Sequence, residues 1–143
     1  MRPGIQLTIE NQPGEVARAN AAFSELAAAH AVPASVRRSL NVALDELLHN
    51  TIAHGFAGRK GGAVTIVVEL GTDRLTVTLA DDGQPFNPLV APSPDTTSSV
   101  EERPIGGLGI HLVRQLMDEV RYQRRADRNV VTLVKRLTGS PDT

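Results

Sequence analysis

The sequence predicts an α+β fold, a two-layer sandwich in which a mostly antiparallel mixed sheet is covered on one face by three helices. Two stretches with the 3.6-residue period of a helix follow a short alternating stretch, and a third helical stretch lies later in the chain. The other alternating stretches come in two pairs, each joined by a short turn, which is typical of antiparallel hairpins. This order of elements predicts one sheet with the helices packed together against it.

The chain begins with a predicted strand and an amphipathic helix. Residues 5–10, IQLTIE, alternate apolar and polar side chains as a half-buried strand does, and NQPGE then breaks the pattern. Apolar residues next recur three and four positions apart up to about His30, which is the spacing of one helix face. They are Val16, Ala19, Phe23, Leu26 and Ala27.

A second and longer helix follows Pro33, because proline suits the opening of a helix. Its predicted end is Gly55, since glycine adopts the left-handed backbone that closes many helices. The apolar face of this helix consists of Val36, Leu40, Ala43, Leu44, Leu47, Leu48 and Ile52.

The second half of the chain supplies the remaining strands and one short helix. The segments AVTIVVEL (63–70) and RLTVTLA (74–80) flank a short GTD and predict a hairpin. Residues 87–106 are rich in proline and small polar residues without periodicity, which predicts a mobile surface loop. The helix LGIHLVRQLM follows, and EVRYQRR and NVVTLVKRL predict a final hairpin that turns near Asp127 and Arg128.

Length and composition limit the function classes. A chain of 143 residues predicts a single domain, with a core over about residues 5–137. A formal net charge of -1 provides no basic field for nucleic acid, so we expect no direct nucleic-acid partner. The sequence has no signal-peptide pattern and no long apolar run, which predicts a cytoplasmic protein without a membrane partner. Because cysteine is absent, disulfides and thiolate metal sites are excluded.

The motif LDELLHNTIAHG contains a pair of polar residues in an apolar setting. Glu46 and Asn50 are four positions apart and therefore share one helix face, which also carries Ala43 and Ala53. A buried acid and a buried amide are costly unless they are paired or bind something. This pair therefore predicts a binding or catalytic site.

Two further motifs have the chemistry of a ligand site. ADDGQPF (80–86) leaves the end of a strand with two acids and a glycine, although a solvated turn has the same composition. GGLGIHL (106–112) is a glycine cluster that opens a helix, where backbone amides and the positive end of the helix attract anions. The cluster lacks the P-loop pattern and follows a long loop, so neither a Walker nor a Rossmann site fits.

The three motifs in this order resemble the N box and the two glycine boxes of the GHKL ATP-binding fold. The short chain, the HG that ends the first motif, and the forms DDGQPFNP and GGLGIHLV are most similar to the anti-sigma factor serine/threonine kinases of bacteria. The resemblance covers about residues 5–137. It implies ATP and Mg²⁺ as cofactors.

The resemblance also implies roles for individual residues. Glu46 would be the general base, Asn50 would bind Mg²⁺, and Arg103 could close over the γ-phosphate, although a loop arginine is more often only solvated. Asp81 would accept a hydrogen bond from the adenine amino group, and Asp82 would face solvent. The residues whose backbones would lie against the nucleotide are Gly83, Gly107, Leu108 and Gly109.

The sequence leaves several assignments open. Gyrase-like members carry a threonine on the last strand that supports the adenine-binding aspartate, and RNVVTL offers Asn129 or Thr132 for that place. His54 could shape the phosphate side or serve only as a structural residue near the helix end, and Lys60 has a claim similar to that of Arg103.

The resemblance implies an enzyme that phosphorylates an anti-anti-sigma partner of the STAS type and holds a sigma factor inactive, with a homodimer as the usual form. One alternative is a non-catalytic module that sequesters a regulator while ATP only stabilises its fold. The other is a histidine-kinase-like ATPase domain that works with a separate phospho-acceptor chain.

Overall fold

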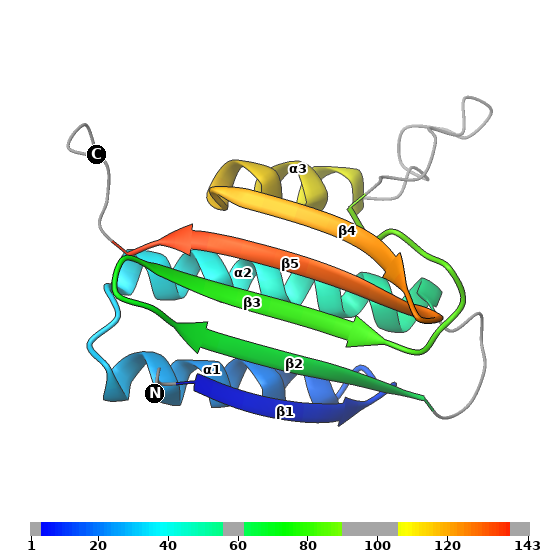
Figure 1. Cartoon of the computed structure of the whole chain (residues 1–143), viewed down its shortest axis with the longest axis horizontal. Coiled ribbons are helices and arrows are strands. Elements are labelled where there is room, and N and C mark those ends of the chain that lie inside the picture. The colour runs from blue at the N-terminus through cyan, green and yellow to red at the C-terminus, as the bar shows by residue number, and fades with distance from the viewer. Residues whose placement is uncertain (1–3, 56–61, 90–105, 138–143) are drawn as a thin grey trace.

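A computed structural model describes residues 4–55, 62–89 and 106–137 of the chain. The described strands form one five-stranded sheet in the order β1-β2-β3-β5-β4 (Figure 1). Every pairing between them is antiparallel, so the parallel component of the predicted mixed sheet does not occur among these strands. The strands are β1 Gly4–Glu10, β2 Ala63–Leu70, β3 Arg74–Asp81, β4 Glu119–Arg125 and β5 Arg128–Arg136.

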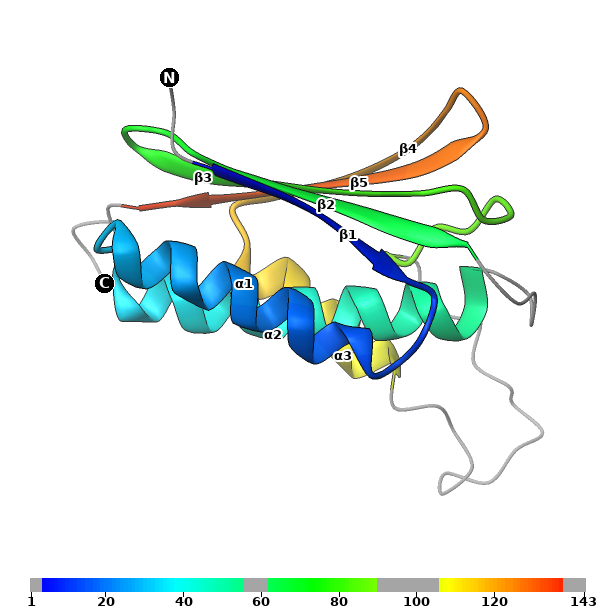
Figure 2. The same cartoon turned by 90° about the horizontal axis from the view of Figure 1, so that it is seen from below.

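Three helices cover one face of this sheet, as the sequence predicted. Figure 2 shows them on the same side, with the opposite face of the sheet left uncovered by any described helix. The middle helix contacts the other two. Within the described residues, no helix is both long enough and apolar enough to cross a membrane. The helices are α1 Glu15–Ala29, α2 Ala34–Asn50 and α3 Gly106–Leu116.

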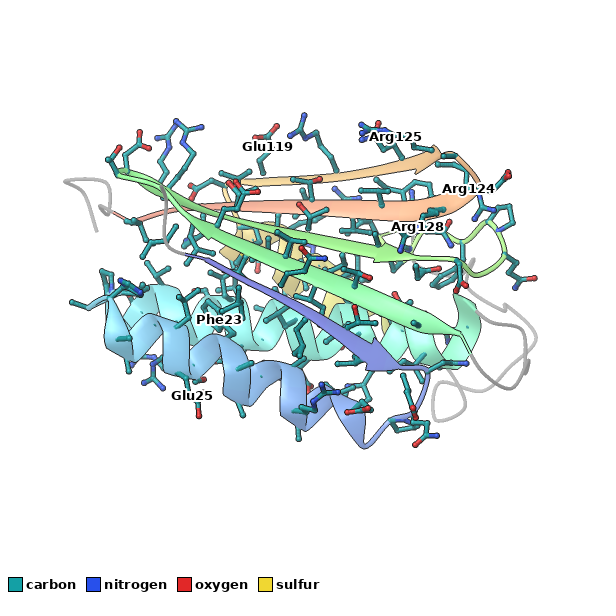
Figure 3. All side chains as sticks on the ribbon, turned by 60° about the horizontal axis from the view of Figure 1, so that its bottom comes forward. Phe23, Glu25, Glu119, Arg124, Arg125 and Arg128 are labelled. Atoms are coloured by element: carbon teal, nitrogen blue, oxygen red, sulfur yellow. The ribbon has the colours of Figure 1, made fainter. Side chains whose placement is uncertain are left out.

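The core lies between the helices and the sheet. Phe23 is fully buried and points from α1 into this layer, whereas Glu25 points away from it (Figure 3). Alternate residues of β2 and β3 are buried and the residues between them are not, so each strand turns one row of side chains toward the helices. The apolar positions predicted for the first two helices are buried, apart from the partly buried Ile52. Each large apolar side chain contributes about 1.5–3 kcal/mol by its burial.

The helical run that contains α2 ends at Gly55, as predicted, but its last turn is not α-helical. Residues Thr51–Gly55 form a π-helical segment, η1, directly after Asn50. A π turn holds more residues per turn than an α turn, so it changes the direction in which the following residues point. In this segment the carbonyl oxygen of His54 accepts a hydrogen bond from Gln84 Nε2 at 3.2 Å. The π turn thereby joins the end of the helix to the loop after β3.

The register of the two central strands brings distant residues together. β3 and β5 pair so that Asp81, the last residue of β3, lies opposite Asn129. The β4–β5 hairpin turns at Ala126 and Asp127, which have φ values of 51° and 62°. Positive φ at both central residues fits the twist of a two-residue hairpin, and the turn lies where the sequence predicted it. The turn and the register together fix Asn129 beside the end of β3.

Candidate functional site

Asp81 lies at the end of β3 with its carboxylate held among buried groups. It is only 6% exposed, and its Oδ1 accepts two hydrogen bonds, from the backbone N–H of Gly83 and from Asn129 Nδ2, each at 2.9 Å. Among the described residues, no donor bonds to its other oxygen, Oδ2. One side of the carboxylate is therefore fixed by the protein, while the other can accept a hydrogen bond from a ligand.

Asn129, and not Thr132, is the residue of β5 that supports Asp81, a choice that the sequence left open. This side chain is 1% exposed, and besides Asp81 its Nδ2 donates to the carbonyl oxygen of Gln84 at 2.7 Å. Its Oδ1 accepts from the backbone N–H of Phe86 at 3.1 Å and from the Tyr122 hydroxyl at 2.6 Å. The four bonds use all the donors and two lone pairs of the amide. Thr132 makes no such contact, because it lies on the other face of β5 and pairs with Thr78.

The loop after β3 is attached to its surroundings at several points. The Arg124 guanidinium donates to the carbonyl oxygen of Gly83 at 2.9 Å, and the His54 ring lies 5.8 Å from that of Phe86. Asp82 is exposed, as the sequence predicted. Sequence reasoning missed both Arg124 and Tyr122, although their spacing of two on β4 places them on the same face of the sheet.

Glu46 and Asn50 lie on one face of α2, as their spacing predicted, and both are partly buried. Asn50 Nδ2 donates to Glu46 Oε1 at 3.4 Å. The Glu46 carboxylate reaches the first turns of α3, where a Cβ atom placed on Gly109 would overlap it. Glycine at position 109 therefore leaves room for the Glu46 carboxylate in its present position, and a side chain there would displace it.

The third motif forms the start of α3. Gly107 and Leu108 lie in its first turn, so their backbone amides are at the positive end of the helix dipole. The remaining predicted residues, Arg103 and Lys60, lie outside the described residues, as does most of the predicted loop 87–106.

The described residues contain no group of three or more histidine, cysteine and acidic side chains that could hold a metal ion by itself. A magnesium ion shared with phosphate groups needs few protein ligands, because it keeps several waters. Asn50 can supply one ligand through its side-chain oxygen, since its hydrogen bond to Glu46 uses the nitrogen. The free oxygen of Asp81 and the amides at the start of α3 likewise suit the base and the phosphates of a nucleotide.

Comparison with known proteins places this arrangement in a family. Residues 9–135 match the histidine kinase-like ATPase domain. The serine-protein kinase RsbW of Bacillus subtilis (strain 168) is 30% identical over 141 residues, which cover 94% of this chain and 86% of that protein. The serine/threonine-protein kinase BtrW of Bordetella bronchiseptica is 31% identical over 100 residues, or 70% of each chain.

A solved structure agrees with the fold. The RsbU and RsbW domains of a Mycobacterium tuberculosis protein superpose with a TM-score of 0.70 at 18% identity, over 96% of this chain. This chain matches only 33% of that longer chain, and at this identity the likeness establishes the fold alone. The family match and the two curated kinases carry the assignment further: the chain belongs to the histidine kinase-like ATPase domain family, whose members use ATP, and within it to the serine-protein kinases of the RsbW type.

Proposed function

We propose that this protein is an anti-sigma factor that uses ATP to phosphorylate a serine or threonine of an anti-anti-sigma partner with a STAS domain, and that it otherwise holds a sigma factor inactive. The observation that carries this proposal is the position of Glu46. Its carboxylate lies one turn before Asn50 and against Gly109 of α3, so an acid stands between the amide that we propose as a metal ligand and the helix that we propose as the phosphate site.

The adenine ring would bind at the end of β3. Asp81 Oδ2 would accept a hydrogen bond from the adenine amino group, because the other oxygen of this carboxylate is already bonded to Gly83 and Asn129. Guanine carries a carbonyl oxygen at the corresponding position, and two acceptors repel each other. We therefore expect selectivity for adenine nucleotides.

The phosphates would bind at the start of α3. The backbone amides of Gly107, Leu108 and Gly109 would donate to phosphate oxygens, assisted by the dipole of the helix. Asn50 would hold Mg²⁺, which neutralises charge on the phosphates when it is bound. The closing of Arg103 over the γ-phosphate stays a prediction from the sequence, because that residue lies outside the described part of the chain.

Glu46 would act as the base in phosphoryl transfer. The acceptor hydroxyl would give its proton to the Glu46 carboxylate while its oxygen bonds to the γ-phosphorus. The bond between that phosphorus and the β–γ bridging oxygen would break, leaving ADP and a phosphorylated partner. The nucleotide state would then decide whether the sigma factor or the anti-anti-sigma protein is bound, with the kinase acting as a homodimer in the cytoplasm and without direct contact to nucleic acid.

A transfer assay tests this proposal. The protein is incubated with Mg²⁺, γ-radiolabelled ATP and a panel of purified STAS-domain proteins from the same genome, beside Glu46→Gln and a control, Glu25→Gln, whose side chain is exposed on α1 and points away from the core (Figure 3). We expect acid-stable labelling of one panel member, reduced by roughly 10²-fold or more in Glu46→Gln and unchanged in Glu25→Gln.

Two outcomes would favour the alternatives raised by the sequence. Binding of ATP without labelling of any panel member would indicate a non-catalytic module that sequesters a regulator. Label that is lost in acid would indicate phosphohistidine, and with it a histidine-kinase-like reaction on another chain. Equal labelling by wild type and Glu46→Gln would reject Glu46 as the base and leave the family assignment intact.

A further inference from the structure

An open groove of about 410 Å³ lies where the three helices meet. All three helices line it, and Glu46 forms part of its wall. Gly109 lies beside this carboxylate, so the groove is continuous with the proposed catalytic centre. The other described residues that line it are Asn20, Asn41, Val42, Asp45 and Leu112.

The apolar part of the lining is unusual for a surface. Val42 is 40% exposed and Leu112 is 42% exposed, and these two are the exposed large hydrophobic residues of the described chain. Val42 lies one helical turn before Glu46, and Leu112 lies three residues after Gly109, so each shares a helix face with a residue of the proposed centre. A single exposed apolar residue needs no explanation, but two from different helices in one groove indicate a contact site.

The polar part of the lining suits a polypeptide backbone. Asn41 Nδ2 donates to Asn20 Oδ1 at 2.9 Å, and Asn41 Oδ1 accepts from Ser24 Oγ at 3.5 Å. These bonds fix the orientation of the two amides between α1 and α2. Each amide retains hydrogen-bonding capacity beyond them, and an amide can both donate to and accept from a peptide group.

The charge of the groove limits which polypeptide segments can bind there. Asp45 is 57% exposed at its side chain, and it and Glu46 are two carboxylates of the lining, with no arginine or lysine among the described residues that line it. An acidic segment would be repelled, whereas a segment with a basic residue would be attracted.

We propose that this groove binds the acceptor segment of the protein substrate as an extended chain. An apolar side chain next to the acceptor serine or threonine would contact Val42 and Leu112, and the backbone would hydrogen-bond to Asn20 and Asn41. The hydroxyl would then meet Glu46. The segment would carry a basic residue and no acidic residue beside the acceptor. This inference rests on the proposed function, and it adds where the substrate binds and by what chemistry.

The test separates acceptor binding from catalysis. Val42→Lys and Leu112→Lys each place a charge on the apolar part of the groove, and both positions are exposed enough to tolerate lysine. His111→Lys is the matched control, because it adds the same side chain to the exposed surface of α3 without lining the groove. Initial rates of transfer are measured with the STAS-domain protein that wild type labels most strongly. We expect the KM for that protein to rise about 10-fold or more in both groove variants, with kcat and the KM for ATP unchanged.

Each contrary outcome has a definite meaning. An unchanged acceptor KM in both groove variants, or an equal rise in His111→Lys, would overturn the groove as the acceptor site while the kinase proposal stands. A parallel loss of ATP affinity would assign the groove to the nucleotide instead. Dissociation of a dimer by Leu112→Lys, seen by sedimentation without a change in KM, would assign the groove to a second copy of the chain. Absence of transfer by wild type would reject the proposed function, and the groove inference with it.

Discussion

The two ends of the candidate site differ in how completely the protein satisfies its own polar groups. At the end of β3, Asp81 and Asn129 are almost fully buried and share a network that includes the backbone of the following loop. Beside α3, Glu46 and Asn50 are partly buried, and the contact between them is a single long hydrogen bond of 3.4 Å. The proposed adenine-binding end is therefore held by hydrogen bonds within the protein, whereas the described residues of the proposed catalytic end make fewer such bonds.

This difference fits the separate tasks that we propose. Selection of adenine over other nucleobases depends on a hydrogen-bond acceptor that is held in place before the nucleotide binds. Misplacement of such a buried group weakens the discrimination between nucleobases. A catalytic carboxylate beside an open groove can instead be completed by the phosphates and by the acceptor segment. The following predictions test whether the contrast holds, beginning with the largest expected effect.

Removal of the Asn129 side chain should cause the largest loss of stability, because it breaks the hydrogen-bond network around Asp81. Asn129→Ala leaves the Asp81 carboxylate, the Tyr122 hydroxyl and two backbone groups without their partner, so we expect a loss of about 2–4 kcal/mol in the free energy of unfolding. Urea denaturation measures it. Thr132→Ala, on the opposite face of the same strand, is the control. A similar loss in both variants would mean that the Asn129 network has no special part in stability.

Asp81→Asn should weaken ATP binding more than it lowers the stability of the fold. An asparagine oxygen can still accept the two bonds from Gly83 and Asn129, but its nitrogen presents a donor to the adenine amino group. We expect ATP affinity to fall by roughly 1.5–3 kcal/mol in calorimetry, because a charge-assisted bond is lost. Asp82→Asn, at the exposed neighbouring position, should bind ATP as wild type does. Equal affinities for all three proteins would move adenine recognition elsewhere.

Gly109→Ala tests the contact between α3 and the Glu46 carboxylate at the proposed catalytic end. The added methyl group would overlap the end of the Glu46 side chain, which can move aside, so we expect little change in the free energy of unfolding but slower transfer because Glu46 is displaced. Gly14→Ala is the matched control, because a Cβ at Gly14 meets nothing within 4 Å. Transfer rates of the two variants give the comparison, and thermal unfolding checks that both remain folded. If Gly109→Ala transfers phosphate like Gly14→Ala, the contact does not constrain the carboxylate.

The smallest effect should come from the β2–β3 turn, which lies outside both ends of the site. A hydrogen bond from the Arg74 guanidinium, and then its charge, lowers the pKa of the exposed Asp73 carboxyl. A folded-state pKa below the unfolded value stabilises the fold above the unfolded pKa, and this stabilisation is lost as the pH falls through the folded pKa. Because both side chains are exposed, Asp73→Asn should leave the free energy of unfolding at pH 7 nearly unchanged. Any small difference from wild type should vanish in acid, where the Asp73 carboxyl is protonated. A large change in the free energy of unfolding at pH 7 would contradict this prediction.

The sequence predicted the elements of the fold closely because their periodicities are local. The alternation in residues 63–70 and the apolar face of the second helix are each complete within one segment. The spacing of Glu46 and Asn50 likewise needs only the geometry of a helix. The burial of Asp81 agrees with its expected place, although its role in binding adenine stays a prediction.

The features that could not be predicted depend on contacts between distant segments. Val130, Val131, Leu133 and Val134 make both faces of β5 apolar, so alternation could not tell whether Asn129 or Thr132 faces the helices. The answer depends on pairing with β3. The groove could not be predicted either, because Val42 and Leu112 come together only through the packing of α2 on α3. The π-helical turn after Asn50 has no sequence signal that we can identify.

The pairing of β3 with β5 also has a consequence for folding kinetics. Asp81 and Asn129 are 48 positions apart, whereas the β2–β3 and β4–β5 hairpins are each closed by a short turn. Local hairpins form before pairings that close long loops, so we expect the bonds of Asn129 to be absent from the folding transition state. Asn129→Ala should then accelerate unfolding and leave the folding rate nearly unchanged. The proposed adenine-binding end would then assemble after the two hairpins have formed.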